Sequence, residues 1–168
     1  MSIRHNRKNN RLQGYDYSQG GAYFVTICAR NREELFGAVN NDMVILNEYG
    51  KIANQTWLEI PEHFPNVGLD KFIVMPNHIH GVIYVVGGAD LRPLQNNGRS
   101  KMILSTVIHG FKSSATRKIR IEYNNTDYIW QRSFYDHIIR NEKSLYKIRE
   151  YIINNPIAWP EDAENIQS

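Results

Sequence analysis

The segment MPNHIHGVIYV, residues 75–85, has two histidines on either side of one isoleucine, followed by a run rich in β-branched residues. Such a run predicts a β-strand, and side chains on a strand alternate between its two faces. We therefore expect His78 and His80 to point to one face and Ile79 to the other. Two imidazoles held side by side could bind a divalent metal ion. The alternative is one structural and one surface histidine, because a short motif alone gives false positives.

A second pair of polar side chains lies on a helix predicted over residues 141–156, which Pro156 is expected to end. Tyr151 and Asn155 are four residues apart, so they lie on one face of that helix, one turn from each other. The side chains of Tyr151 and Asn155 could therefore both point to one place on a neighbouring sheet. The alternative is an amphipathic tyrosine and a C-terminal asparagine cap, since the residue before a proline tends to leave the helical conformation.

The composition limits the class of protein. The chain has 168 residues, of which 42% are hydrophobic and 22% charged, as expected for one globular domain. No apolar run approaches the length of a membrane span, and residues 1–11 lack the apolar core of a secretory signal. The single cysteine, Cys28, excludes an intrachain disulfide framework. We expect a cytoplasmic protein without a membrane partner, with a basic flexible tail over residues 1–14, one domain over 15–157 and an acidic tail over 158–168.

The basic residues are segregated along the chain, although the net charge is only +3. Residues 4–11 and residues 99–120 contain lysines and arginines but no acidic residue. Such segments indicate a polyanion partner. The alternative is a solvated helix face together with a flexible basic tail.

The elements that must position these side chains follow from hydrophobic periodicity and turn residues. Strands are predicted over 21–30, within 41–50, and over 69–76, 78–86 and 127–139; helices are predicted over 48–64, 100–120 and 141–156. Two βαβ-like halves that meet in an antiparallel sheet predict a ferredoxin-like α+β fold. We expect the helices on one face of that sheet and the histidine strand at its centre.

Three segments together resemble a known family: FIVMPNHIHGVIYV, GFKSSATRKI and IWQRSFYDHIIRNEKSLYKIREYIINNP. They are similar to the REP-associated tyrosine transposases, which are single-tyrosine members of the HUH endonuclease superfamily, named for histidine-hydrophobe-histidine. The resemblance extends over about residues 14–157. It implies that the last helix carries a catalytic tyrosine and that the histidine strand carries the HUH motif.

The resemblance also implies roles for single residues. His78 and His80 match the metal-binding histidines, and Tyr151 matches the catalytic tyrosine. Asn155 stands where related enzymes have a third polar ligand, often a glutamine. Since asparagine is shorter than glutamine, the third ligand stays open, and so does the choice of nucleophile. The alternative ligands are Asp136 and His137, and the alternative nucleophile is Tyr135.

The implied chemistry is consistent with these residue types. A divalent ion on two imidazoles would withdraw charge from the nonbridging oxygens of a phosphodiester, and a tyrosine could attack to give a 5′-phosphotyrosine and a free 3′ hydroxyl. Imidazole and amide ligands that leave open positions for phosphate favour Mg²⁺ or Mn²⁺.

The substrate implied by the resemblance is single-stranded DNA near hairpins, typically repetitive extragenic palindromes. The basic segments would then contact phosphates. The candidate DNA-binding residues are Arg4, Arg7, Lys8, Arg11, Lys112, Arg117, Lys118 and Arg120.

Two other functions stay open on the sequence. One is a nucleic-acid-binding module without catalysis, because ferredoxin-like sheets often bind RNA. The other is a metal-dependent nuclease that uses water in place of the tyrosine. A monomer and a homodimer are both open, since related transposases include both.

Overall fold

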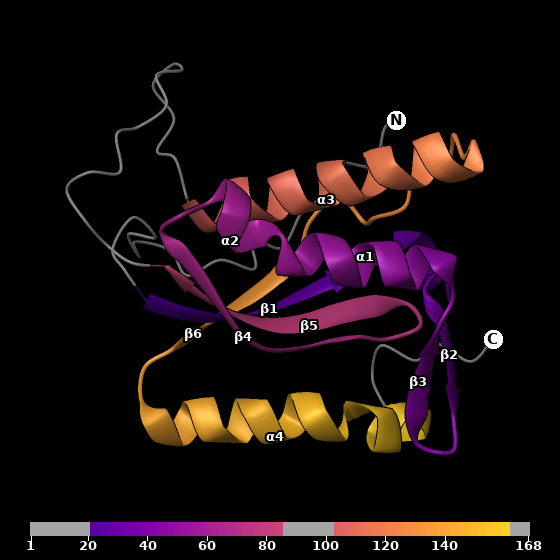
Figure 1. The fold of residues 1–168 in the computed structure, drawn as a ribbon. Coiled ribbons are helices and arrows are strands. Elements are labelled where there is room, and N and C mark those ends of the chain that lie inside the picture. The colour runs from indigo at the N-terminus through magenta and orange to yellow at the C-terminus, as the bar shows by residue number, and fades with distance from the viewer. Residues whose placement is uncertain (1–20, 86–102, 162–168) are drawn as a thin grey trace, which may run out of the picture.

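The computed structural model describes residues 21–85 and 103–161 (Figure 1). In chain order its elements are β1 (Gly21–Cys28), the 3-10 turn η1 (Arg30–Arg32), β2 (Gly37–Asn40), β3 (Met43–Leu46), α1 (Glu48–Leu58), α2 (Ile60–His63), β4 (Val67–Val74), β5 (His78–Val85), α3 (Ile103–Tyr123), β6 (Tyr135–Ile139), α4 (Glu142–Ala158) and the 3-10 turn η2 (Trp159–Glu161). The predicted basic tail and most of the predicted acidic tail lie outside the described residues.

A four-stranded sheet with the order β4-β5-β1-β6 organises these elements. Its three neighbouring strand pairs are all antiparallel, and a separate hairpin joins β2 to β3. The strand order and directions are those of a ferredoxin-like sheet, so the predicted α+β fold is confirmed. The histidine strand β5 is an inner strand, as predicted, because the apolar residues on both of its faces need cover from neighbours.

The helices lie on both faces of the sheet (Figure 1). The main core packs one face against α1 and α3, with Trp57 and Phe111 as large buried side chains. A smaller cluster packs the other face against α4, with Val82 of β5 and Ile152 of α4 at its centre. The expectation that all helices share one face is therefore wrong. The reason is that β5 carries apolar residues on both faces, and α4 is the element that covers the second one.

Several element boundaries differ from the sequence prediction, and two of them affect the surroundings of the histidines. The segment predicted as a strand over 127–139 is extended only from Tyr135 onward, and before it only Trp130 bridges to Ala29. Helix α4 continues through Pro156 to Ala158. A proline in the last turn removes one backbone hydrogen bond but leaves the earlier turns intact. The folded part of the chain thus extends past residue 157.

Helix α4 is tied to the sheet by an ion pair at a bulge in β4. The pairing of β4 with β5 shifts between Leu69 and Phe72. Within this bulge Asp70 accepts hydrogen bonds from Nε of Arg149 at 3.0 and 3.1 Å and from the Tyr84 hydroxyl at 3.0 Å. The bulge therefore aims a carboxylate at α4 and fixes the helix on the sheet.

A glycine lies directly after the second histidine and lets α1 come close to the sheet. A Cβ built on Gly81 would lie 2.4 Å from Cζ2 of Trp57. Only glycine therefore admits the Trp57 ring at this point, and the indole closes the face of β5 behind the histidines. None of the helices in the two described ranges is long and apolar enough to cross a membrane.

Candidate active site

The two histidines lie side by side on the α4 face of the sheet. The register of β5 against β1 places His78 opposite Cys28 and His80 opposite Thr26, so both point to the same face as predicted. Their ring centroids are 4.3 Å apart. Both side chains are buried, at 0% and 2% exposure.

The orientation of His78 is fixed by its neighbour in sequence. The Asn77 side-chain amide donates to the carbonyl oxygen of Arg32 at 3.1 Å, so the amide oxygen faces the imidazole. That oxygen can only accept, and it lies 2.7 Å from Nδ1 of His78. Nδ1 therefore carries the proton and Nε2 keeps its lone pair, which is the tautomer that a metal ligand needs.

His80 is held between two hydroxyl groups. Its Nδ1 lies 2.9 Å from Oγ1 of Thr26, and its Nε2 lies 3.2 Å from the hydroxyl oxygen of Tyr151. Burial, and to a smaller extent the neighbouring His78, hold the pKa of His80 well below its usual range. The ring is therefore neutral at neutral pH. Since a metal ligand must be neutral imidazole, His80 is in the state that could bind a divalent ion.

Helix α4 and the 3-10 turn η2 that follows it bring three side chains to this face at intervals of about one turn. Tyr151 contacts His80, and its ring also lies edge-on to Phe24, with centroids 6.0 Å apart. Asn155, one turn further along α4, is fully buried. Trp159 follows after another turn, with its ring 5.9 Å from that of His78. Tyr151 and its partner histidine were predicted from the sequence. Trp159 was not, and its only signal was a large aromatic residue in an otherwise polar tail.

The alternative residues on β6 separate into two groups. Asp136 pairs with Val25, whose side chain belongs to the α1–α3 core, so its carboxylate lies on the opposite face from the histidines. His137 pairs with Phe24 and Tyr135 pairs with Thr26, so both are on the histidine face. Asp136 is therefore wrong as an alternative metal ligand. Tyr135 remains an alternative candidate for the nucleophile.

A cavity of about 400 Å³ opens beside His80 and contains both tyrosines. Its wall also includes Arg32, a cation that the sequence analysis did not identify. Arg32 and Asn31 have φ angles of +58° and +51°. Left-handed backbone in non-glycine residues is unfavourable and is often found at functional sites. This turn brings Arg32 to the wall of the cavity that His80 also lines, and no local pattern in the sequence predicts it.

The donor set for a metal is small. Among the described residues, no group of three or more histidine, cysteine, aspartate or glutamate side chains could hold an ion. A metal here would be bound by Nε2 of His78 and His80, with the buried Asn155 of α4 as the candidate third ligand. Two neutral imidazoles with open positions fit an ion that must also bind phosphate oxygens.

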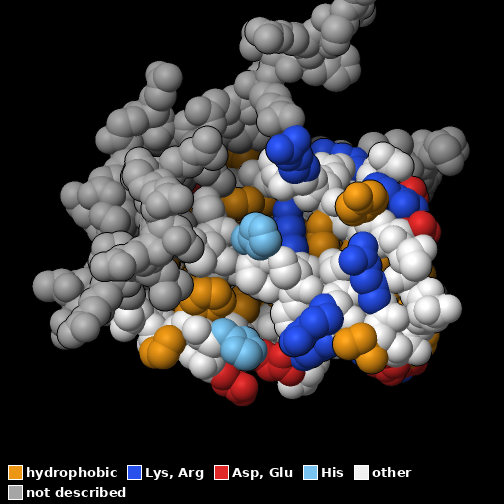
Figure 2. Space-filling view, turned by 90° about the horizontal axis from the view of Figure 1, so that it is seen from above, with side chains coloured by type: hydrophobic (Ala, Val, Ile, Leu, Met, Phe, Trp, Pro, Cys, Tyr) orange, Lys and Arg blue, Asp and Glu red, His pale blue; other side chains and the backbone are white. Residues whose placement is uncertain are grey.

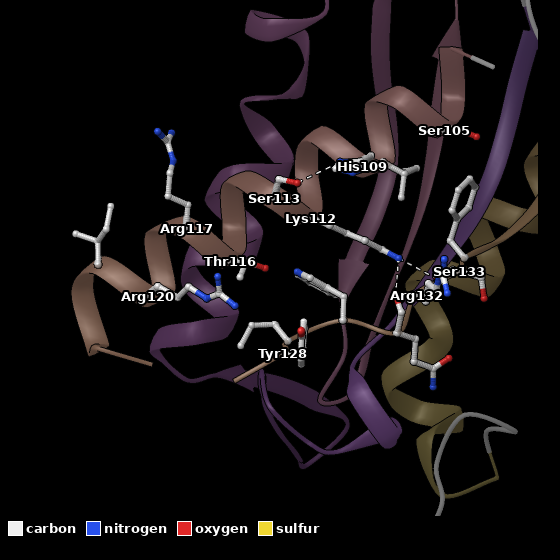
Figure 3. A pocket seen from close by; sticks show the side chains of 16 residues that line it. Ser105, His109, Lys112, Ser113, Thr116, Arg117, Arg120, Tyr128, Arg132 and Ser133 are labelled. Carbon is white, nitrogen blue, oxygen red and sulfur yellow. Dashed lines mark hydrogen bonds between the residues drawn. The ribbon is translucent and has the colours of Figure 1, made fainter. Parts of the chain in front are cut away.

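The predicted DNA-binding residues on α3 have different surroundings. Arg117 and Arg120 line a second hollow, of about 730 Å³, along α3. Lys118 instead forms an ion pair with Glu59. Nζ of Lys112 donates to the carbonyl oxygens of residues 131 and 133, at 2.9 Å each (Figure 3). Burial lowers the pKa of Lys112 to about 8. Two of the four cations therefore have structural partners, while Arg4, Arg7, Lys8 and Arg11 lie outside the described residues.

No family model matches the chain. It is 42% identical over 169 residues to an uncharacterized protein of Haemophilus influenzae, covering 94% of this chain and 92% of that protein. It is 25% identical over 147 residues to a putative REP-associated tyrosine transposase of the same organism, covering 84% of this chain and 73% of that protein.

Two solved structures share the fold. One is a REP-associated tyrosine transposase bound to a REP hairpin, with a TM-score of 0.61, 22% identity and coverage of 89% of this chain and 73% of that one. The other is a putative transposase from Deinococcus radiodurans, with a TM-score of 0.50, 15% identity and coverage of 86% and 95%. The sheet and its helices are therefore an arrangement that transposases use.

Proposed function

We propose that this chain is a REP-associated tyrosine transposase that cleaves and rejoins single-stranded DNA next to hairpins. Its similarity to a putative member of that family and the fold it shares with another support this proposal. In this proposal the hydroxyl of Tyr151 attacks the phosphodiester and forms a covalent 5′-phosphotyrosine. The observation that carries it is the contact of 3.2 Å between that hydroxyl and Nε2 of His80. The nucleophile is thus beside the nitrogen that would bind a divalent ion.

Each residue of the site has a definite task in this reaction. Asn77 and Thr26 orient the two imidazoles through Nδ1, so that Nε2 is the atom of each ring that would bind Mg²⁺ or Mn²⁺. When bound, that ion supplies positive charge at the nonbridging phosphate oxygens. Arg32 adds a second positive charge from the wall of the cavity. A guanidinium suits this position because it donates several hydrogen bonds in a fixed plane.

The proposed reaction needs no reactant other than the tyrosine and the DNA, because one bond forms for each bond that breaks. The Tyr151 oxygen forms a bond to phosphorus and loses its proton to water, since 45% of the side chain is exposed. The bond from phosphorus to the 3′ oxygen breaks, and that oxygen takes up a proton. A second 3′ hydroxyl can reverse the step and join a new strand, because the phosphotyrosine is itself a diester.

The DNA hairpin is proposed from the relatives. One solved structure with this fold is a REP-associated tyrosine transposase bound to a REP hairpin. In this chain Arg117 and Arg120 are described α3 cations that line an open hollow, and we assign them to phosphates of the strand that carries the hairpin.

The test is incubation with a panel of hairpin-bearing single strands and Mn²⁺, followed by a denaturing gel. A protein band shifted by covalently bound DNA supports the proposal. Cleavage without such a band would favour a metal-dependent nuclease that uses water. Binding without cleavage across the panel would favour a non-catalytic nucleic-acid-binding module.

A further inference from the structure

The larger of the two hollows described above lies along helix α3, and the smaller one lies beside His80. One wall is α3 and the other is segment 128–134, which leads into β6 (Figure 3). Polar side chains recur along this face of α3 at intervals of three or four residues. They are Ser105, His109, Ser113, Thr116, Arg117 and Arg120. We refer to this hollow as the α3 groove.

The charge of the α3 groove suits a polyanion. Arg117 and Arg120 come from α3, and Arg132 comes from the opposite wall. No acidic side chain is among the described residues that line it. The space-filling view shows lysines and arginines spread over the face that carries α3 (Figure 2). Serine and threonine hydroxyls between the cations add hydrogen-bond donors for phosphate oxygens.

An aromatic side chain distinguishes a single strand from a duplex as the occupant. Tyr128 lines the α3 groove and is 76% exposed. An exposed ring beside a basic groove can stack on an unpaired base, whereas bases in a duplex have no free face. The neighbouring Trp130 does not have this role, because its ring packs against Phe36 and Phe111 at 4.9 and 5.3 Å.

The α3 groove and the catalytic cavity share one wall. Gln131, Ser133 and Phe134 line both hollows. Lys112 fastens this wall from α3, through its hydrogen bonds to the carbonyl oxygens of residues 131 and 133. A strand that leaves the cavity beside Tyr151 can therefore cross the wall and continue along α3.

We propose that the α3 groove binds the single-stranded DNA that flanks the cleaved linkage, with Arg117, Arg120 and Arg132 on its phosphates and Tyr128 on a base. Lys112 is a positioning residue that holds the shared wall. This inference rests on the proposed function, because only that function supplies a cleaved linkage. The binding of a single strand to the α3 groove can nevertheless be measured without cleavage.

The test measures the affinity of the whole protein for a fluorescein-labelled oligodeoxythymidine as the salt concentration is raised. The variant is Arg117→Gln with Arg120→Gln. The control is Lys118→Gln, which removes one positive charge next to Arg117; Lys118 forms an ion pair with Glu59 and does not line the α3 groove. We expect the slope of log affinity against log salt to fall by about 1.4 in the double variant, because each phosphate contact on a single strand contributes about 0.7. We expect no change of slope in Lys118→Gln.

An unchanged slope in the double variant, or an equal fall in the control, would overturn the inference. A second measurement uses 4-thiothymidine in the strand: irradiation should cross-link it to the peptide that contains Tyr128, and Tyr128→Ser should weaken binding severalfold. Cross-links confined to other peptides would also overturn it. If the slope falls as expected but no hairpin strand gives an adduct, the α3 groove stands and the proposed function fails. If adducts form and the slope is unchanged, the proposed function stands and the α3 groove as a binding site for single-stranded DNA fails.

Discussion

The hydroxyl of Tyr151 on α4 lies 3.2 Å from Nε2 of His80 on β5, although the two residues are 71 positions apart. The contact depends on α4 crossing the sheet face opposite to α1 and α3. It also depends on the pair between Asp70 and Arg149, which fixes α4 two residues before Tyr151. A candidate nucleophile and a candidate metal ligand therefore meet through tertiary structure alone.

The first prediction separates the two tyrosines of the cavity. Tyr151→Phe should fold and bind hairpin DNA but form no covalent adduct, because only the attacking oxygen is removed. Tyr135→Phe is the matched control and should keep adduct formation, since no contact joins the Tyr135 hydroxyl to a histidine among the described residues. Peptide mapping of the trapped adduct gives the linked residue. A DNA-linked peptide with Tyr135 would contradict the assignment.

The second prediction concerns the ion. Replacing His78 and His80 together by alanine should abolish cleavage and spare most of the affinity for a hairpin-bearing single strand, because the basic residues on α3 are untouched. Chelation of divalent ions should have the same effect on the unaltered protein, and Mn²⁺ should restore it. Cleavage at the full rate in the double variant would remove the case for a metal on these imidazoles.

A third prediction tests the hydroxyl that orients His80. Thr26→Val keeps the shape of the side chain but removes the partner of Nδ1. Loss of such a hydrogen bond behind a metal ligand typically costs about 10–100-fold in metal affinity or activity. Thr56→Val is the control, because Thr56 is equally buried on α1, away from the cavity. We expect the Mn²⁺ concentration for half-maximal cleavage to rise only in Thr26→Val. Equal values for both variants would show that Thr26 has no orienting role.

A fourth prediction concerns stability and pH. Hydrogen bonds from Arg149 lower the pKa of Asp70 in the folded protein. A carboxyl with a lowered folded pKa contributes stability that is fully present above its unfolded pKa, about 4, and is lost as the pH falls through the folded value. Asp70→Asn should therefore lower the free energy of unfolding by about 1 kcal/mol at pH 7, a modest figure because Arg149 is 40% exposed.

The check is denaturant unfolding of Asp70→Asn and the unaltered protein from pH 7 down to pH 3. The difference between them should shrink below about pH 4. Asp42→Asn, at an exposed position in the turn between β2 and β3, is the control and should show no such pattern. A difference that stays constant with pH would mean that Asp70 acts through packing rather than through its charge.

Much of this arrangement could be predicted from residue patterns. The period-two alternation of a strand predicted that His78 and His80 share one face of β5. The spacing of four residues predicted that Tyr151 and Asn155 share one face of α4. These are local rules, so they hold before the chain folds. The α+β class followed from the order of the elements.

The missing parts depend on long-range packing. The hydrophobic periodicity of α4 does not predict which face of the sheet this helix covers, because an amphipathic helix can cover either face. Arg32 lies in the cavity because of a turn with left-handed backbone, and Trp159 lies beside His78 because α4 continues past Pro156. Lys112 and Lys118 looked equivalent to Arg117 in sequence, and only the partners that surround them distinguish their tasks.

The contact between Tyr151 and His80 joins two elements of a single chain, and this has a consequence for genetic complementation. In a site assembled in cis, a subunit that lacks the nucleophile cannot be rescued by one that lacks the metal ligands. A mixture of the Tyr151→Phe protein with the His78→Ala, His80→Ala protein should therefore form no adduct at any mixing ratio. Adduct formation by the unaltered protein should rise in direct proportion to its concentration, without the steeper dependence that a site shared between two subunits would give.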